Sequence, residues 1–306
     1  MRVAAIDIGT NSVLLLIAEQ RGHELVALAE RAVITRLGRG VDATRKLDPA
    51  AAELTLACLA QYASEIERAG ATRVAAVGTS AMRDATGGEA FQARATELLG
   101  VAPRVISGDE EAQLTFSGAL TGIALEGPVI VFDLGGGSTE VIRGNAGVSP
   151  TVEQAASLDV GSVRLTERHV SCDPPSPDEL AAVRRDTRDA LATLGAGWAR
   201  SSRLVGVAGT VTTLAACALK VVPYDANRIH GARLTADAVA HTTATLARVP
   251  LAERRAVPAV DPSRADVIVA GGIIVEEILD WAGASELWVS DRGVRWGLAK
   301  RLASGG

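Results

Sequence analysis

Short apolar runs alternate with amphipathic stretches along the first 122 residues. The runs at 2–8, 13–17 and 73–77 have the length and composition of strands. The stretch 48–70 begins with Asp-Pro, places its apolar residues on one helical face and ends at a glycine, which predicts a helix. A further helix is expected over 110–122. Hairpin strands mixed with crossover helices indicate an α/β domain.

The second half repeats this pattern. Ser176 and Glu179 form a capping box for a helix running to Gly195. Residues 204–213 contain a strand, a glycine turn and the start of a helix, and 286–290 is a final strand. We therefore predict two α/β domains, 1–122 and 123–294, with a cleft between them. A final helix near 295–306 is expected to pack back onto the first domain.

One short motif occurs twice, about one domain length apart. Each copy is an apolar run, then Asp, an aliphatic residue, Gly, two small or polar residues and Ser, and a second apolar run follows. The copies are Asp7-Ile-Gly9-Thr10-Asn11-Ser12 and Asp133-Leu-Gly135-Gly136-Gly137-Ser138. This repetition suggests a duplicated hairpin with the same purpose in both domains.

The second copy carries the stronger chemical signal. Three consecutive glycines let several backbone N–H groups point into one concavity, which suits phosphate oxygens, and Ser138 and Thr139 add hydroxyl donors. Asp133 and Glu140 are hard oxygen ligands suited to a magnesium ion that completes its shell with water and phosphate. The alternative is a glycine-rich hairpin turn beside a solvated acid.

Two further glycine loops are weaker signals. Gly209-Thr210 lies in a glycine-threonine loop between a strand and a helix, and Gly271-Gly272 opens another helix. Each alone is more often a place of close strand–helix packing, but four such loops in one chain are hard to explain as turns alone. The phosphate cradle is therefore expected to include Gly209 and Thr210.

Composition and charge narrow the class of partner. The chain has 306 residues and a formal net charge of −5, so nothing in its overall charge favours nucleic acid or an anionic membrane. Three cysteines without metal-type spacing exclude a disulfide framework and a zinc cluster. We expect a cytoplasmic protein without a membrane segment. Scattered arginines, Arg36, Arg39, Arg164, Arg292 and Arg295, could line an anionic channel or simply lie on the surface.

Several motifs, in order along the chain, carry a family resemblance. The chain resembles the exopolyphosphatase/guanosine pentaphosphate phosphohydrolase (Ppx/GppA) family of the actin-like ATPase superfamily. The matching stretches are 7–12, 36–40, 79–84, 106–112, 133–140, 161–166 and 229–231. The segment 290–297 follows the family's closing motif only loosely, with Trp296 where an acid is common.

The resemblance implies a fold, a reaction and residue roles. It implies two ribonuclease H-like domains and magnesium-dependent hydrolysis of the terminal phosphoanhydride of inorganic polyphosphate, of guanosine pentaphosphate (pppGpp), or of both. By motif, Glu111 is the catalytic base, Arg83 the cation on the phosphate and Asp133 the magnesium ligand. The Asp7 and Asp133 loops, 7–12 and 133–139, are the implied phosphate cradle. The acids at 110 and 111 would otherwise suit a capped helix start.

Our sequence-based interpretation is an exopolyphosphatase of the short type. The alternatives are a pppGpp phosphohydrolase, a sugar or acetate-type kinase on the same fold, and a non-catalytic sensor of polyphosphate or an alarmone. Short family members lack the extra C-terminal domains that help form a polymer channel. A short member is therefore expected either to prefer short polyphosphates or to extend the groove by forming a homodimer.

Overall fold

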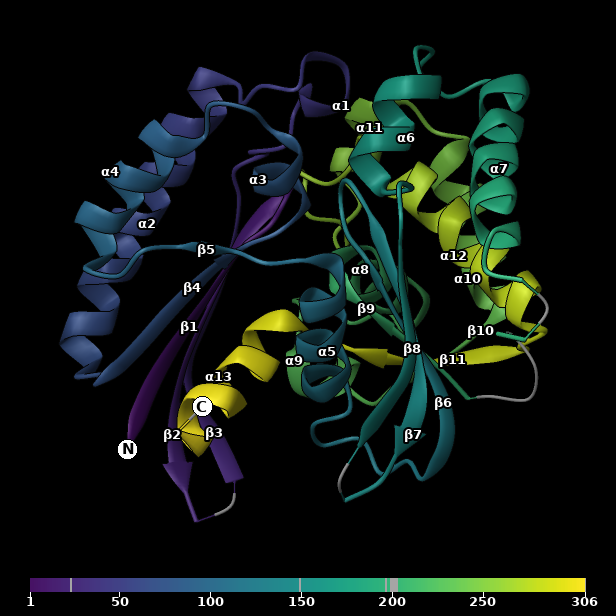
Figure 1. The fold of residues 1–306 in the computed structure, drawn as a ribbon. Coiled ribbons are helices and arrows are strands. Elements are labelled where there is room, and N and C mark those ends of the chain that lie inside the picture. Colours follow the sequence, from purple (N-terminus) through teal and green to yellow (C-terminus); the bar gives the residue numbers. More distant parts are fainter. Residues whose placement is uncertain (23, 149, 196, 199–202, 306) are drawn as a thin grey trace. The chain divides into compact units, whose positions relative to one another are not determined.

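The chain folds into two units, and each is built of alternating strands and helices. The computed structural model describes residues 1–22, 24–148, 150–195, 197–198 and 203–305 (Figure 1). Unit 1 contains Met1–Gly118 and Val294–Gly306, and unit 2 contains Ala119–Gly293. Each unit is described by itself below.

The sheet of unit 1 combines an antiparallel meander with parallel crossovers. Its strands are β1 (Arg2–Ile8), β2 (Ser12–Arg21), β3 (Glu24–Ile34), β4 (Arg73–Gly78) and β5 (Arg104–Val105). They lie in the order β3-β2-β1-β4-β5. The first three strands pair antiparallel, whereas β1, β4 and β5 run parallel.

Capping residues determine where helices of unit 1 begin and end. They are α1 (Val41–Thr44), α2 (Pro49–Ala69), α3 (Ser80–Asp84), α4 (Glu89–Leu99), α5 (Gly108–Ala119) and α13 (Val294–Ser304). Before α2, the Asp48 side chain accepts from the amide of Ala51 at 2.9 Å, and Gly70 ends the helix in the left-handed conformation. The predicted helix over 48–70 is confirmed.

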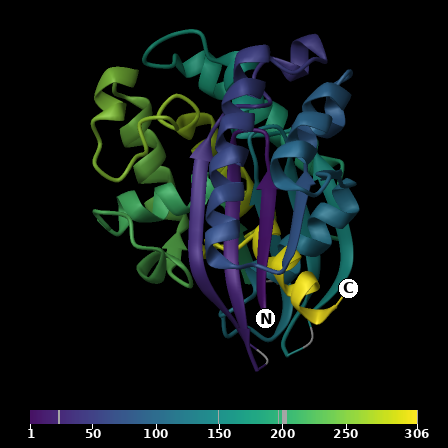
Figure 2. The same cartoon turned by 90° about the vertical axis from the view of Figure 1, so that its left-hand side faces the viewer.

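Both faces of β1 in the unit 1 sheet are buried. Along β1, Ala4, Ile6 and Ile8 belong to one apolar cluster with residues of α2, and Figure 2 looks onto this helix-covered face. Val3 and Ala5 point the other way, into a cluster that contains Trp296 of α13. This alternation is the two-residue period of a strand. It places Asp7, the next odd position, on the face with Val3 and Ala5.

The last helix completes the second face of unit 1. Trp296 is 1% exposed, and its indole N–H donates to the Glu30 carboxylate of β3 at 3.2 Å. Arg295 donates to the same Glu30 oxygen at 2.7 Å. The large indole therefore fastens α13 to the sheet.

Unit 2 repeats the topology of unit 1. Its strands are β6 (Gly127–Leu134), β7 (Thr139–Ala146), β8 (Thr151–Leu158), β9 (Arg203–Val207), β10 (Arg233–Thr235) and β11 (Glu286–Ser290), in the order β10-β11-β9-β6-β7-β8. The meander β6-β7-β8 is antiparallel, and β6, β9 and β11 run parallel. Strands β6, β7, β8, β9 and β11 thus match β1 to β5, and β10 is added at the edge. This is the ribonuclease H-like order, so the predicted fold class is confirmed for both units.

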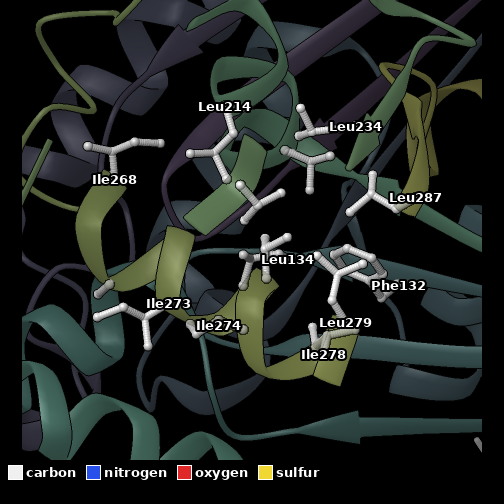
Figure 3. Packing of buried hydrophobic residues seen from close by; sticks show 14 of the residues in the cluster. Phe132, Leu134, Leu214, Leu234, Ile268, Ile273, Ile274, Ile278, Leu279 and Leu287 are labelled. Atoms are coloured by element: carbon white, nitrogen blue, oxygen red, sulfur yellow. The ribbon is translucent and has the colours of Figure 1, made fainter. Parts of the chain in front are cut away.

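Helices α8 and α12 build the main core of unit 2. The helices are α6 (Ser162–His169), α7 (Pro177–Ala192), α8 (Ala208–Ala218), α9 (Ala226–Ile229), α10 (Ala236–Ala247), α11 (Leu251–Arg255) and α12 (Ile268–Ala282). Phe132 and Leu134 of β6 pack with Leu214 of α8 and with Ile273 and Ile278 of α12 (Figure 3). Because side chains alternate along a strand, Asp133 points to the opposite face of the sheet.

Among the described residues, no helix is both long enough and apolar enough to span a bilayer.

Candidate functional site

The repeated motifs form two hairpins closed in the same way. The amide of Gly9 donates to the Ser12 carbonyl at 3.0 Å, and the amide of Gly135 donates to the Ser138 carbonyl at 3.0 Å. A Cβ on either glycine would stand 3.0 Å from that carbonyl oxygen. The sequence repeat is therefore a repeat of backbone geometry, and a side chain at either glycine would be tightly packed against it.

In the loop of unit 2, residues 135–138, three carbonyl groups accept hydrogen bonds on one side of the loop. The carbonyls of Gly135 and Gly136 accept from the amides of Ser162–Arg164, at the start of α6, at 2.9–3.0 Å. The Gly137 carbonyl accepts from the side-chain Nε of Arg164 at 2.5 Å. In a trans peptide the C=O and the next N–H point in opposite directions. The amides of residues 136, 137 and 138 are therefore directed away from α6, as an anion-binding nest requires.

Close packing behind this loop leaves no room for a side chain at Gly161. A Cβ there would stand 2.4 Å from the Gly136 carbonyl oxygen. The Thr139 hydroxyl donates to the Val160 carbonyl at 2.7 Å, which joins β7 to the segment before α6. Ser138 is 4% exposed. Direct contacts of Ser138 and Thr139 with phosphate stay a prediction.

The loop of unit 1 is supported by main-chain amides instead. The Thr10 carbonyl accepts from the amide of Gly38 at 2.8 Å, and the Asn11 carbonyl accepts from the amides of Thr35 and Arg36 at 3.1 and 3.0 Å. By the same peptide geometry, the amides of Asn11 and Ser12 face the other way. The motif 36–40 therefore supports this loop as 161–166 supports the loop of unit 2.

A second observation ties the unit 1 loop to α3. The hydroxyl groups of Thr10 and Ser80 lie 2.7 Å apart in a hydrogen bond, and both residues are buried. The nearby Gly38 could not carry a side chain, because a Cβ would stand 2.2 Å from the Thr10 methyl group. The start of α3 and the loop are thus held in a fixed relation.

The structure brings the two predicted catalytic side chains together. Arg83, from α3, donates through Nη1 to Glu111 Oε2 at 3.1 Å and to the Ile106 carbonyl at 3.0 Å. Glu111 lies in the first turn of α5 and is 6% exposed. Burial beside a guanidinium gives this carboxylate a fixed orientation, which a general base needs.

Its neighbour Glu110 has a different environment. Glu110 pairs with Arg104 through two hydrogen bonds of 2.5 and 2.6 Å and also accepts from Arg301 of α13. These contacts, with Arg104 first, lower the pKa of Glu110 to about 2. Successive helix residues point about 100° apart, so the two acids serve different partners. Glu110 is held by two arginines, whereas Glu111 is buried beside Arg83, and its role as the base stays a prediction.

Asp133 and Glu140 are direct partners across β6 and β7. Directly opposed residues share one face of an antiparallel pair with their Cβ atoms about 5 Å apart, so the two carboxylates can reach one ion. Glu140 is 2% exposed and accepts from the Ser157 hydroxyl at 2.8 Å. Within the described part of the chain no cluster of three or more His, Cys, Asp or Glu is suited to a metal. Two carboxylates suit magnesium, which usually keeps several waters.

The glycine-threonine loop begins α8 with a strained backbone. Ala208 has φ +78°, a conformation that residues with a Cβ rarely adopt. A Cβ on Gly209 would fall 1.7 Å from Nη1 of Arg264, so that guanidinium lies directly against the loop. Thr210 packs against Gly271, and a Cβ added to Gly271 would stand 2.7 Å from the Thr210 side chain. Contact of Gly209 and Thr210 with phosphate stays a prediction.

Arg264 is the main residue that the sequence analysis missed. Burial lowers the pKa of the Arg264 guanidinium, and the charge of Asp261 offsets this shift only in part. No spacing or motif distinguishes this arginine in the sequence, because its position depends on the loop before α12.

The fold and the loops together define a class. Two ribonuclease H-like units, each with an Asp-aliphatic-Gly hairpin whose amides are turned outward, are the architecture of the actin-like ATPase superfamily. The chain belongs to the Ppx/GppA phosphatase family, whose sequence pattern matches residues 16–304.

Similar proteins agree with this assignment over the full length. The chain is 40% identical to Exopolyphosphatase 2 of Mycobacterium tuberculosis, over 99% of this chain and 98% of that protein. It is similar to the crystal structure of the Aquifex aeolicus member of the Ppx/GppA family, with a TM-score of 0.84, 34% identity and coverage of 100% and 98%. An exopolyphosphatase structure from Cytophaga hutchinsonii shares the fold, with a TM-score of 0.92, 24% identity and coverage of 100% and 98%.

Proposed function

We propose that this protein is an exopolyphosphatase that hydrolyses the terminal phosphoanhydride of inorganic polyphosphate and releases orthophosphate. The observation that carries the proposal is the loop 135–138, in which the carbonyls of residues 135–137 are hydrogen-bonded to α6, so that the amides of residues 136–138 point to the other side. The main-chain amides of such a loop can bind the oxygens of a phosphate, because they are not turned towards a carboxylate of the protein. The full-length similarity to Exopolyphosphatase 2 supports the choice of polyphosphate as substrate.

In this proposal, Glu111 takes the proton of the attacking water. Its carboxylate is buried and oriented by Arg83. When a terminal phosphate is bound, Arg83 has free donor capacity for its oxygens, because a guanidinium carries five N–H groups and this one gives Nη1 to Glu111 and Ile106. Phosphoryl transfer needs mainly alignment, charge stabilisation and an oriented nucleophile, and in this proposal Glu111 orients the water while Arg83 stabilises charge.

We also propose that the reaction depends on magnesium. Asp133 and Glu140 would hold the ion, because they are directly opposed on β6 and β7 and supply the hard oxygen donors that it prefers. Bound there, magnesium would offset the negative charge of the phosphate chain. The Ser157 hydroxyl, which donates to Glu140, keeps the carboxylate in place.

One experiment tests the proposal and its alternatives side by side. Orthophosphate release by the purified protein is measured with short polyphosphate, long polyphosphate and pppGpp, each across a magnesium titration. We expect magnesium-dependent release with a higher kcat/KM on polyphosphate than on pppGpp. A higher kcat/KM on pppGpp would replace the proposal with the nucleotide phosphohydrolase. Binding of polyphosphate without release from any substrate would favour the sensor. In a parallel reaction with ATP, ADP formation that needs an acceptor would favour a kinase.

A further inference from the structure

Arg164 occupies an unusual position behind the loop of unit 2. It lies in the first turn of α6 and is 6% exposed. Its Nε–H donates to the Gly137 carbonyl at 2.5 Å, and its own backbone amide donates to the Gly136 carbonyl at 3.0 Å. The carboxylate of Asp159, whose side chain is 86% exposed, is 3.7 Å from Nη2.

The hydrogen bond from Nε acts on one particular peptide group. The carbonyl of Gly137 and the amide of Ser138 belong to the same peptide plane, and they point in opposite directions. Donation by a cation to the carbonyl draws electron density through the peptide and makes the amide on the far side a stronger donor. The same bond also fixes the plane, so the amide keeps its direction without help from a ligand.

The two loops differ at this one point. In unit 1, the corresponding carbonyl is that of Asn11, and it accepts from the neutral main-chain amides of Thr35 and Arg36. In unit 2, the support is a buried guanidinium. The duplicated hairpins thus share their closing bond, but only the loop of unit 2 carries a positive charge on this carbonyl.

We infer that Arg164 is a positioning residue, which orients and polarises the Ser138 amide for an oxygen of a bound phosphate. Arg164 acts through its contact with the Gly137 carbonyl. The inference deepens the proposed function, on which it rests for the identity of the substrate. The binding of an inorganic phosphate oxyanion by the loop of unit 2 can be tested without that function.

Orthophosphate affinity is the direct measurement. Thermal unfolding is followed at a series of orthophosphate concentrations for the wild type, Arg164→Met, Arg164→Lys and Arg168→Met, and the dissociation constant is taken from the ligand-induced rise in Tm. Methionine removes the donor and the charge but keeps an unbranched chain, whereas lysine keeps a charge and N–H donors. Arg168 lies on the same helix, is 39% exposed and is 3.9 Å from Asp186, so Arg168→Met is the matched control.

We expect Arg164→Met to weaken orthophosphate binding about tenfold, since residues that orient metal ligands from behind contribute tenfold to hundredfold in affinity. Arg164→Lys should recover most of this loss, and Arg168→Met should bind as the wild type does. A purely structural role would lower the Tm without ligand in Arg164→Met and leave its dissociation constant unchanged. Equal affinity of the wild type and Arg164→Met, including no binding by either, would overturn the inference, as would equally weak binding by the lysine and methionine variants.

Turnover separates this inference from the proposed function. With polyphosphate, Arg164→Met should lower kcat/KM at least as much as it lowers orthophosphate affinity, and kcat should fall as well, because the transition state carries charge on the same oxygens. If the wild type released no phosphate from polyphosphate, the proposed function would fail. The comparison of orthophosphate affinities would then still decide on Arg164.

Discussion

Replacing Gly161 with alanine tests how closely the start of α6 must approach the loop 135–138. The backbone at Gly161 is extended, with φ −157° and ψ 160°, so alanine causes no strain of its own. Its Cβ, however, would stand 2.4 Å from the Gly136 carbonyl oxygen and 2.6 and 2.7 Å from the carbonyl carbons of Gly136 and Gly137. Ordinary contacts begin near 3.4 Å, so the loop or the helix must move by about 1 Å.

The size of the effect follows from that displacement. Inserting a methyl group into a packed site typically costs about 1–3 kcal/mol, and a misplacement of about 1 Å in a catalytic site can cost about 100-fold in rate. We therefore expect Gly161→Ala to unfold at lower urea concentration and to lose about 100-fold in kcat/KM for phosphate release from polyphosphate. The activity loss should exceed what the stability loss explains, because the protein stays folded under assay conditions.

Gly88→Ala is the control for this prediction. Gly88 has φ −75° and ψ −2°, and a Cβ there meets no atom within 4 Å, so alanine should be accommodated. Both variants are assayed at equal concentrations of folded protein. If Gly161→Ala kept the activity and the urea midpoint of Gly88→Ala, the close approach of α6 would not be what shapes the loop.

Further predictions concern the acids of the site. Glu111→Gln should lower kcat by about 10²–10⁴ with little change in KM, because it removes the base and keeps the shape; an unchanged kcat in steady-state assays would exclude Glu111 as the base. Asp133→Asn should raise the magnesium concentration needed for half-maximal activity, and superimposable magnesium titrations would contradict this role. Glu110 has its pKa lowered from 4.5 to about 2, so the stability it contributes is present above pH 4.5 and is lost as the pH falls towards 2. Glu110→Gln should flatten the decline of urea stability in that range, and an equally steep decline would refute the pairing with Arg104 and Arg301.

Local patterns in the sequence predicted local structure well. The capping box at Ser176 and Glu179 forms as expected, because both partners lie within one helical turn. The duplicated hairpin was recognisable for a similar reason, since Asp, Gly and Ser at fixed spacing specify one strand–turn–strand geometry. The closing bonds at Gly9 and Gly135 confirm that geometry.

Long-range partners could not be predicted from such patterns. The arginines considered for an anionic channel illustrate this. Arg164 is buried behind a loop, Arg292 donates to the Thr121 carbonyl at 3.0 Å, and Arg295 pairs with Glu30. Each partner lies far away in the sequence. The residues around an isolated arginine do not indicate where its guanidinium will lie in the folded protein.

The same limit applies to helix surfaces. Arg184 and Arg188 have the spacing of a solvated helical face, yet both pair with Glu277 of α12, which is 3% exposed. A carboxylate buried this deeply is retained only when it is paired. Sequence spacing gave the helix correctly and could not show that its charged side faces another helix.

The position of α13 has a consequence for the order in which the chain acquires its structure during synthesis. Unit 2 is continuous in sequence, whereas the apolar cluster around Val3 and Ala5 of β1 includes residues of α13, from Val294 onward. While the ribosome is still making unit 2, that cluster lacks the part that α13 supplies. The first unit to begin synthesis is thus the last to complete its core. A messenger RNA truncated just before the codon for Trp296 would yield a complete second unit attached to an incomplete first one.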